Sequence, residues 1–361
     1  MSVEYKNTGV ISVGIKCPMF KQGDDVVKIV SDCVLETFKG YNQYHDKYVY
    51  DINDKDIIGI TESVVARTHG TYLTLDDLVK EIKEKCPSGE VALINPIYSR
   101  NRFSMILKAF ARACNRILII MPEYDEVGNP RGLNKVTGVN IMEYYKTLCY
   151  ENNCVCEILN DYQELKNVFE YANIRKIDCS LRPDKLFNEF LTLRDFGTQI
   201  NSTYGLLGSN KANEETLKLF PTVEDSVKTC YGIKNYIKEK TGKTVEVMVY
   251  GDGCFKDATS GIWEFADPDV SPFYTEGLDG SPNEIKTKYF IDGKFSNLNG
   301  DELECAIQNE IKNKKTNLVG SMSSQGTTPR KYVNLLASLM DLTSGSGDRC
   351  TPVVVVKNYF N

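Results

Sequence analysis

Residues 53–76 read NDKDIIGITESVVARTHGTYLTLD, and this stretch decides the fold of the chain. Its centre, 57–60, is a short run of isoleucines that only Gly59 interrupts. Such a β-branched run predicts a buried strand rather than a helix, because these side chains pack well on a pleated sheet. A helical or irregular segment, 63–70, follows the strand. We expect it to place Arg67 beside the carboxyl end of the strand, a favoured ligand position in α/β proteins.

The segment before this strand predicts a helix. A Gly23-Asp24-Asp25 turn leads into apolar residues that recur at helical spacing. These residues are Val26, Val27, Val30, Cys33 and Val34. A second helix is predicted over 225–240, with Val227, Cys230, Tyr231 and Ile237 facing inward and Lys234 interrupting that face.

The middle of the chain has a different rhythm. Four apolar runs that predict strands lie at 90–94, 117–121, 155–159 and 176–181. Helical patterns separate them, with an apolar face at 103–113 and further helices at 141–150 and 165–171. Alternating strands and helices indicate parallel βαβ units. We therefore predict an α/β subdomain over 88–196, inserted between the two parts, 1–87 and 197–361, of another domain.

The loop that opens the first helix of this subdomain contains Arg100 and Arg102, with Ser99 and Asn101 as capping residues. Two arginines at a helix N-terminus suit an anion, because the free backbone N–H groups point outward there. The alternative is a solvated helix start with ordinary surface arginines. No glycine-rich phosphate loop favours the anion site.

Composition narrows the possible classes of function. The 361 residues carry a net charge of −6, which argues against a broad nucleic-acid-binding surface. No apolar stretch is long enough to span a bilayer, and we expect no signal peptide, because the N-terminus has no basic segment followed by an apolar core. Twelve cysteines without a Cys-x-x-Cys pair, and only two histidines, favour reduced buried thiols over a disulfide framework or a zinc site. We expect a cytoplasmic protein that binds neither nucleic acid nor membrane.

Residues 245–257, VEVMVYGDGCFKD, are the strongest candidate for chemistry. Alternating valines predict a strand, which ends in Gly251-Asp252-Gly253. An aspartate between two glycines at a strand end leaves its carboxylate exposed and its backbone open to a ligand. Most Gly-Asp-Gly sequences are simple turns, so the residues alone leave both roles open.

Five segments resemble, in the right order, the coenzyme F-420 gamma-glutamyl ligase family, and the turn Gly251-Asp252-Gly253 is one of them. The Gly23-Asp24-Asp25 helix entry and the segment 62–70, ESVVARTHG, are similar to its N-terminal motifs, with Glu62 at a position where the family has lysine. Ser209-Asn210, followed by Leu219-Phe220-Pro221, is similar to an Asp-x-Ser-Asn and Leu-Leu-Pro pattern. The family's metal-binding aspartate there falls on Leu207. The closing helix 335–342, the turn 344–348 and the strand 352–357 resemble the family's last unit.

The resemblance implies an α+β fold, in which a ligase-like domain with a mixed or antiparallel sheet is interrupted by the parallel α/β subdomain. It implies an amide-bond ligase that uses GTP and Mg or Mn to join L-glutamate, or another amino acid, to a carboxylate acceptor through an acyl phosphate. It also implies a homodimer. A non-catalytic homologue that binds a nucleotide or a small anion is the alternative.

The resemblance also assigns candidate site residues. Asp252 falls on the family's metal-binding aspartate, and Asp252 with Asp257 would hold the metal. Asp252 and Lys256 are the candidates for catalysis. The candidates for binding substrate or nucleotide are Arg67, Ser209, Asn210, Ser344 and Gly345. The turn that begins at Ser344 can wrap a phosphate with its backbone or merely cap a helix.

Overall fold

The computed structural model describes residues 9–39, 51–95, 100–124, 130–133, 138–160, 174–179, 191–251, 255–256, 263–264, 271–281, 287–313, 331–344 and 350–360. The chain forms two compact units. One consists of Met1–Thr275 with Ala337–Asn361, and the other of Glu276–Leu336. No helix within the described ranges is long and apolar enough to cross a membrane. The cysteines within those ranges are free thiols.

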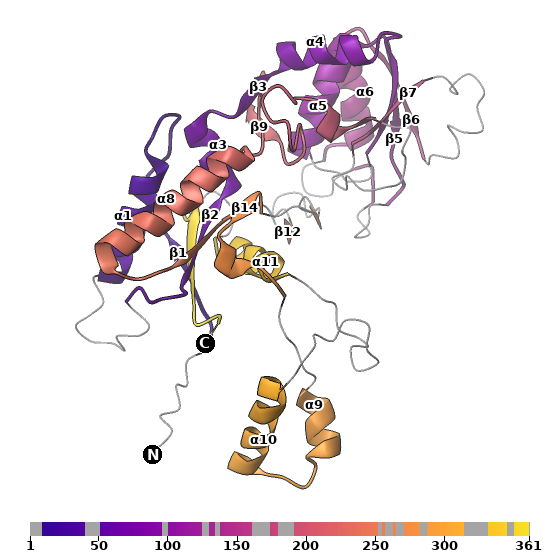
Figure 1. The fold of residues 1–361 in the computed structure, drawn as a ribbon. Coiled ribbons are helices and arrows are strands. Elements are labelled where there is room, and N and C mark those ends of the chain that lie inside the picture. The colour runs from indigo at the N-terminus through magenta and orange to yellow at the C-terminus, as the bar shows by residue number, and fades with distance from the viewer. Residues whose placement is uncertain are drawn as a thin grey trace. The chain divides into compact units, whose positions relative to one another are not determined.

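Sheet A of the larger unit is mixed, with the strand order β1-β15-β2-β11-β14. Its strands are β1 (Ile11–Ile15), β15 (Val353–Lys357), β2 (Ile57–Thr61), β11 (Glu246–Tyr250) and β14 (Phe273–Tyr274). Strands β2 and β11 pair in parallel, and every other pair is antiparallel. The predicted strands at 57–60 and 245–250 therefore lie side by side at the centre of this sheet (Figure 1).

Three helices cover one face of sheet A. They are α1 (Val26–Lys39), α3 (Glu62–His69) and α8 (Val223–Thr241), and their apolar residues share one core cluster with alternate residues of the sheet, such as Ile58 and Ile60. Helix α11 (Tyr332–Ser344) reaches the opposite face at Gly59. A Cβ at Gly59 would lie 2.1 Å from Sδ of Met340, so only glycine leaves room for this contact.

Helix α8 confirms the predicted helix over 225–240 but corrects one of its side chains. Tyr231 is exposed rather than inward, and its ring packs beside that of Phe273 with the ring centroids 5.7 Å apart. A helix turns about 100° per residue, so Tyr231 lies beside the buried row of Cys230, Ile233 and Ile237 and not within it. Lys234 is buried despite its charge, because Glu246 on β11 accepts hydrogen bonds from its ammonium at 3.0 and 3.1 Å.

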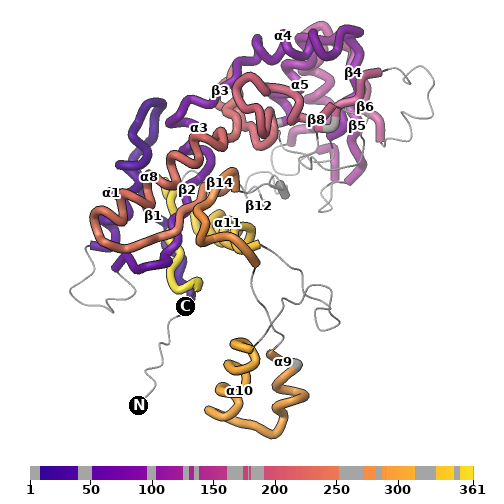
Figure 2. Tube along the Cα trace, viewed as in Figure 1, coloured from indigo at the N-terminus to yellow at the C-terminus, as the bar shows by residue number. Residues whose placement is uncertain are grey.

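Sheet B joins segments that are far apart in the sequence. It is antiparallel, with the order β3 (Tyr72–Thr74), β10 (Thr216–Lys218) and β9 (Asn210–Asn213). The chain leaves this sheet at β3 and enters α4 (Leu75–Lys85), both labelled in Figure 2, and it returns to the sheet at β9, which is labelled in Figure 1. Residues 75–209 therefore lie, in the sequence, between two strands of sheet B.

Sheet C is all-parallel, with the order β6-β5-β4-β7-β8. Its strands are β4 (Glu90–Ile94), β5 (Arg116–Ile120), β6 (Val155–Leu159), β7 (Arg175–Asp178) and β8 (Leu191–Thr192). Helices α5 (Arg100–Ala113) and α6 (Ile141–Glu151) alternate with the strands, and the 3₁₀ turn Leu193–Asp195 follows them. The predicted helix at 165–171 lies outside the described residues.

The predicted fold class is confirmed: mixed sheet A, antiparallel sheet B and parallel sheet C occur in one α/β chain. The boundaries 88 and 196 of the inserted subdomain stay a prediction. Strands β12 (Phe255–Lys256) and β13 (Trp263–Glu264) form a separate antiparallel pair. The smaller unit contains the helical segments Glu276–Leu278, α9 (Thr287–Tyr289), Phe290–Lys294 and α10 (Gly300–Asn313).

Candidate functional site

Two parallel strands end beside each other at one edge of sheet A. Thr61, the last residue of β2, is in register with Tyr250, the last residue of β11. Glu62 then begins α3, and the buried Gly251 follows β11. The backbone N–H of Thr61 donates to the carbonyl of Pro352 at 3.0 Å, so the start of β15 lies at the same edge. We call this the carboxyl edge of sheet A.

A buried ion pair lies at this edge, and the sequence analysis missed it. The Glu62 residue is 3% exposed and Lys218, from β10, is 5% exposed. The ammonium of Lys218 lies 3.4 Å from each carboxylate oxygen of Glu62. A lysine this buried needs a charged partner, because desolvation disfavours an isolated charge. Glu62 was visible in the sequence as a departure from the family, but Lys218 is 156 residues away and only the fold pairs them.

Sheet B places a predicted residue next to this lysine. Lys218 is directly opposite both Tyr72 of β3 and Asn210 of β9. Directly paired residues of antiparallel strands project to the same face, so Asn210 shares a face with Lys218. Ser209 precedes Asn210 and is buried, and its hydroxyl has no hydrogen-bond partner among the described residues. Asn210 and Lys218 therefore form one polar row that ends at Glu62.

Ser344, near the C-terminal end of the chain, is linked to the same edge by a hydrogen bond. It is the last residue of α11, is buried, and donates from Oγ to the carbonyl of Asp341 at 3.1 Å. The hydroxyl of Thr351 donates to the carbonyl of Ser344 at 2.7 Å. Because Thr351 precedes Pro352, the end of α11 and the carboxyl edge are joined by hydrogen bonds.

Arg67 lies elsewhere on α3. The helix begins at Glu62, and a rise of 1.5 Å per residue puts Arg67 about 7.5 Å further along its axis. The Arg67 side chain is exposed in the last turn, which Gly70 ends in a left-handed conformation with φ of 74°. Thus Glu62, rather than Arg67, is the charged residue at the end of β2.

The remaining predicted residues are only partly described. Lys256 lies in β12, but its side chain is outside the described part of the chain. Asp252, Asp257 and Gly345 are outside it altogether. Their roles stay predictions. The residues just before two of them, Gly251 before Asp252 and Ser344 before Gly345, both lie at the carboxyl edge.

Leu207 shows what stands at the position of the family's metal-binding aspartate. It is buried in the core cluster that joins α4, α5 and sheet C, where no charged ligand would be tolerated. Among the described residues, no group of three or more His, Cys, Asp or Glu could hold a metal ion. Mg²⁺ needs only one or two protein carboxylates when substrate phosphates complete its coordination shell. The carboxylates of Asp252 and Asp257 would therefore be enough to hold it.

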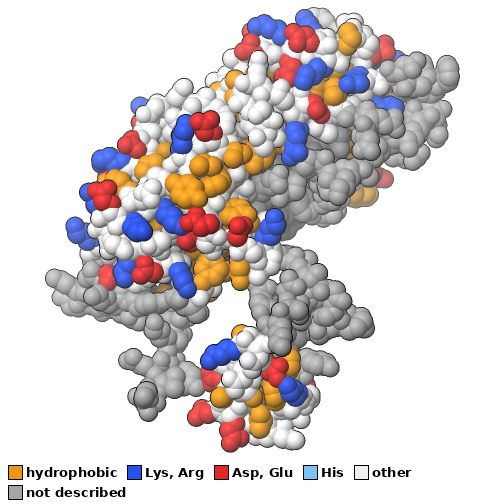
Figure 3. All heavy atoms as spheres, viewed as in Figure 1, with side chains coloured by type: hydrophobic (Ala, Val, Ile, Leu, Met, Phe, Trp, Pro, Cys, Tyr) orange, Lys and Arg blue, Asp and Glu red, His pale blue; other side chains and the backbone are white. Residues whose placement is uncertain are grey.

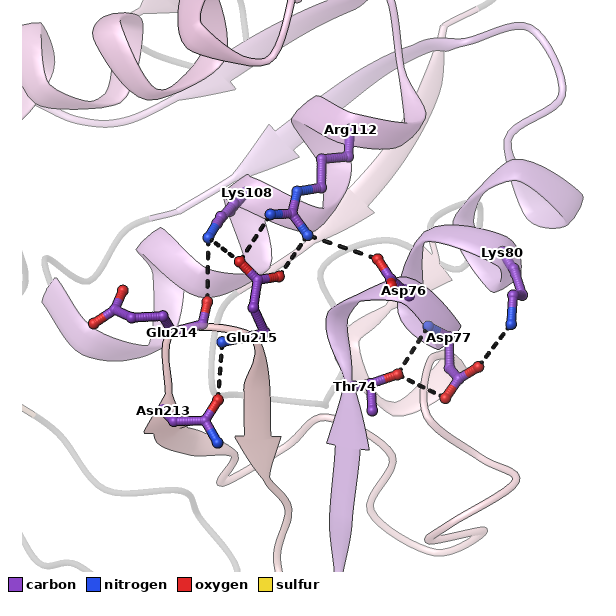
Figure 4. A network of polar contacts seen from close by, with 9 residues as sticks. All are labelled: Thr74, Asp76, Asp77, Lys80, Lys108, Arg112, Asn213, Glu214 and Glu215. Atoms are coloured by element: carbon purple, nitrogen blue, oxygen red, sulfur yellow. Dashed lines mark hydrogen bonds and ion pairs between the residues drawn. The ribbon is translucent and has the colours of Figure 1, made fainter.

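An exposed network holds the β9–β10 hairpin, which carries Asn210 and Lys218, against helix α5 (Figure 4). Arg112 donates to both carboxylate oxygens of Glu215 at 2.6 and 2.9 Å, and Lys108 donates to one of them at 2.7 Å. The hydrogen bonds from Arg112 and Lys108 lower the pKa of Glu215 to about 2. This network positions the hairpin relative to the helix from outside the site.

The surface has no single-sign field on the face that Figure 3 shows. Lys and Arg side chains are interspersed there with Asp and Glu side chains over the described elements. Nucleic-acid-binding surfaces concentrate basic residues on one face or along one helix. The described residues of this face therefore do not show the charge distribution of a nucleic-acid-binding surface.

A known protein family matches most of the chain. The family described as F420-0:Gamma-glutamyl ligase matches residues 14–358, which is nearly the whole chain. No curated protein matches the sequence significantly. The match spans all three sheets, so both the ligase-like part and the parallel subdomain lie within it.

Proposed function

The chain belongs to the F420-0:gamma-glutamyl ligase family, and we propose that it joins L-glutamate, or another amino acid, to a carboxylate acceptor. The proposal rests on one observation. The parallel ends of β2 and β11 bring the Glu62–Lys218 pair beside Gly251, from which the chain continues into Asp252. Ligand sites of α/β sheets form outside such strand ends.

The chemistry needs positive charge at two stages. An acceptor carboxylate oxygen attacks the γ-phosphorus of GTP, which releases GDP and leaves an acyl phosphate. The amino group of glutamate then attacks the acyl carbon, phosphate leaves, and the amine loses a proton. Both steps develop charge on phosphate oxygens, and fixed cations in a water-poor site stabilise that charge strongly.

In this proposal Lys218 supplies the fixed cation, and Glu62 holds its ammonium in place before the ligand arrives. Asn210 and Ser209 hydrogen-bond the ligand from sheet B. Lys256 faces phosphates or substrate carboxylates, and the Ser344-Gly345 turn contacts phosphate through its backbone; Arg67, in the last turn of α3, is left without a role at the carboxyl edge. Asp252 and Asp257 hold Mg²⁺ or Mn²⁺, which neutralises the nucleotide phosphates when it is bound.

The direct test is turnover. Purified protein is mixed with F420-0, L-glutamate, GTP and Mg²⁺ or Mn²⁺, and the glutamylated product is measured by mass spectrometry together with GDP. Parallel reactions replace the acceptor or the amino acid, because Glu62 differs from the family residue. A protein that binds GTP and metal without releasing GDP under any of these conditions supports the non-catalytic alternative instead.

The role of Asp252 is tested by the Asp252→Asn variant, which keeps the side-chain size and removes the charge. Ligands that bind the folded state raise the melting temperature by mass action. We expect GTP with Mn²⁺ to stabilise the wild type and the metal-dependent part of this stabilisation to disappear in the variant. An unchanged response to metal would show that Asp252 is only a turn residue.

We also propose a homodimer, which follows from the family resemblance alone. Closed two-fold dimers are the commonest oligomers of soluble proteins. Light scattering at micromolar concentration measures the mass directly. The mass of a single chain under these conditions would overturn the proposal.

A further inference from the structure

Helix α6 ends in a tight turn that contains two of the buried cysteines. The N–H of Cys154 donates to the carbonyl of Cys149 at 3.0 Å, and the N–H of Asn153 donates to the carbonyl of Tyr150, also at 3.0 Å. Asn153 is in the left-handed region, with φ of 59°. These features define a Schellman motif, in which the side chains at the two ends of the turn commonly pack together.

In this chain both ends of the motif are cysteines. Cys149 and Cys154 are buried in the same core cluster, and both are free thiols. Because a hydrogen bond of 3.0 Å joins the carbonyl oxygen of one to the nitrogen of the other, standard bond lengths place their Cα atoms at most about 7 Å apart. Two cysteines within this separation can be bridged by a disulfide without a movement of the backbone.

The two thiols also interact with each other. The thiol of Cys154 donates weakly to the carbonyl of Val155 at 3.6 Å, so its sulfur can accept a hydrogen bond from Cys149. This hydrogen bond lowers the pKa of Cys154, whereas the hydrogen bonds with Cys154 and then with Cys156 raise the pKa of Cys149. The thiolate is the reactive form of cysteine, so Cys154 is the nucleophile of the pair and Cys149 is the proton donor beside it.

The pair lies just below the surface. Cys154 is 4% exposed, but Asn153 and Val155 on either side of it are exposed, and β6, which begins at Val155, is an edge strand of sheet C. A local opening of this turn is therefore enough for a small neutral oxidant to reach the sulfur of Cys154. Cys230 is different, because it is completely buried in the core between α8 and sheet A, and burial raises its pKa.

We propose that Cys149 and Cys154 form a reversible oxidation site, which hydrogen peroxide converts into a disulfide. The Cys154 thiolate attacks one oxygen of the peroxide, the O–O bond breaks and hydroxide leaves, so that Cys154 becomes a sulfenic acid. The sulfur of Cys149 then attacks the sulfur of Cys154, the S–O bond breaks, and a second hydroxide leaves. The two thiol protons convert the two hydroxides into water. Two thiols are thus oxidised to one disulfide, and one peroxide is reduced to two waters.

The experiment treats the native full chain with stoichiometric hydrogen peroxide and maps the product. Unreacted thiols are blocked with iodoacetamide in denaturant. A protease that cleaves after glutamate then separates residues 144–151, which contain Cys149, from residues 152–157, which contain Cys154 and Cys156. We expect the two fragments to be joined by a disulfide, with a mass about 2 Da below their sum because two hydrogens are lost. Dithiothreitol should release both fragments.

Three variants make the test specific. Cys156→Ala is the matched control, because it removes the neighbouring half-buried thiol and leaves both ends of the Schellman motif intact, and it should form the disulfide at the wild-type rate. Cys154→Ala should slow the joining of the two fragments at least about tenfold. In Cys149→Ala/Cys156→Ala the sulfenic acid of Cys154 has no thiol beside it in this turn, so dimedone should trap it on residues 152–157. The mapping of the wild type needs no substitution, and it decides the question if a buried variant does not fold.

Three outcomes would overturn the site: the native protein joins the two fragments only after Cys230 has reacted, Cys156→Ala prevents the disulfide, or Cys154→Ala forms it through Cys156 at the wild-type rate. A folded Cys149→Ala/Cys156→Ala protein without a dimedone adduct would overturn the role of Cys154 as the nucleophile. None of these outcomes bears on ligase turnover, which is measured by product formation.

Discussion

Sheet A has a buried lysine–carboxylate pair at each end of strand β2, but the two pairs are built differently. One pair lies at the carboxyl edge, and the other lies where β2 begins, which we call the amino edge. At the amino edge, the ammonium of Lys357 is completely buried. It donates to the carboxylate of Asp56 and, at 2.6 Å, to the carbonyl of Asp51, and it lies 4.9 Å from the centre of the Phe38 ring. At the carboxyl edge, Lys218 contacts only the two oxygens of Glu62 among the described residues, both at 3.4 Å.

The difference separates a structural role from a functional one. Two hydrogen bonds and the face of the Phe38 ring engage the completely buried Lys357 ammonium, so this pair is not available to a ligand. The long, symmetric contacts of Lys218 leave its third N–H free of Glu62, because an ammonium has three donors. We infer that the amino edge fixes the end of β15 on β2, whereas the carboxyl edge keeps a cation available beside Gly251.

The largest expected effect follows from breaking the amino-edge pair. Lys357→Met leaves the Asp56 carboxylate buried and without its cation, which costs about 3–5 kcal/mol of unfolding free energy. Denaturant unfolding measures the loss. The double variant Asp56→Leu/Lys357→Met is the control, since it removes both charges and should recover most of the stability. A loss below about 1 kcal/mol for Lys357→Met would mean that this pair is not the structural one.

Breaking the carboxyl-edge pair should cost less stability and more activity. Lys218→Met is expected to lower the free energy of unfolding by about 2 kcal/mol, because its hydrogen bonds are long, and to reduce kcat about 100-fold or more. The control is Glu62→Lys/Lys218→Glu, which keeps a buried pair but exchanges its charges. It should be more stable than Lys218→Met and still impaired in turnover.

If Lys218→Met unfolds as readily as Lys357→Met while kcat is unchanged, the proposed functional role of Lys218 is wrong. Lys218 would then be structural, and the two edges would not differ. A rise in KM with an unchanged kcat has another meaning, because it assigns Lys218 to binding that is equal in the ground and transition states.

The contrast between the edges also shows what a sequence can predict. The strands at 57–60, 90–94 and 155–159 are predicted from local apolar runs, and all three are confirmed. The first two are largely buried, whereas the third is an edge strand of sheet C and only partly buried. The parallel arrangement of sheet C follows from strand–helix alternation and is confirmed as well. These predictions use only residues that are close together in the chain.

Pairs that the fold assembles had no such signal. Lys218 lies 156 residues from Glu62, and Lys357 lies 301 residues from Asp56. In the sequence, Lys218 interrupts a short apolar run and Lys357 ends one, and nothing near them indicates which carboxylate is the partner. Lys234 likewise interrupts the apolar face of its predicted helix. Tyr231 was placed inward because helical spacing cannot distinguish a core aromatic from one that covers a neighbouring strand at the surface.

A smaller effect is expected between the edges, at the centre of β2. Gly59→Ala puts a Cβ 2.1 Å from Sδ of Met340 and 3.0 Å from a ring carbon of Tyr250, which should cost about 1–2 kcal/mol of overpacking. Gly14→Ala in β1 is the matched control, because its Cβ would meet only ordinary contacts, the nearest at 3.6 Å. Thermal unfolding of both variants measures the difference, and equal melting temperatures would contradict the close approach of α11.

The smallest effect on stability is expected for the exposed ion pairs of Glu215, shown in Figure 4, which differ from the two buried pairs. The chelated geometry of these pairs is better than that of Lys218, but the Glu215 side chain is 53% exposed, so solvent screening reduces their contribution to about 1 kcal/mol or less. If burial rather than geometry sets the size of these effects, Glu215→Gln must destabilise less than either lysine variant despite its shorter contacts.

The pH dependence identifies this contribution. Because Arg112 and Lys108 lower the pKa of Glu215 to about 2 from an ordinary value of 4.5, the folded state favours the ionised carboxylate. The stabilisation is therefore complete above the ordinary value and is lost as the pH falls toward 2. The difference in unfolding free energy between wild type and Glu215→Gln should shrink over that range. Glu214→Gln, whose carboxylate forms an ion pair with Lys211 within the same hairpin, should give a smaller difference. A constant difference from neutral to acid pH would show that Glu215 acts through its shape, and not through its charge.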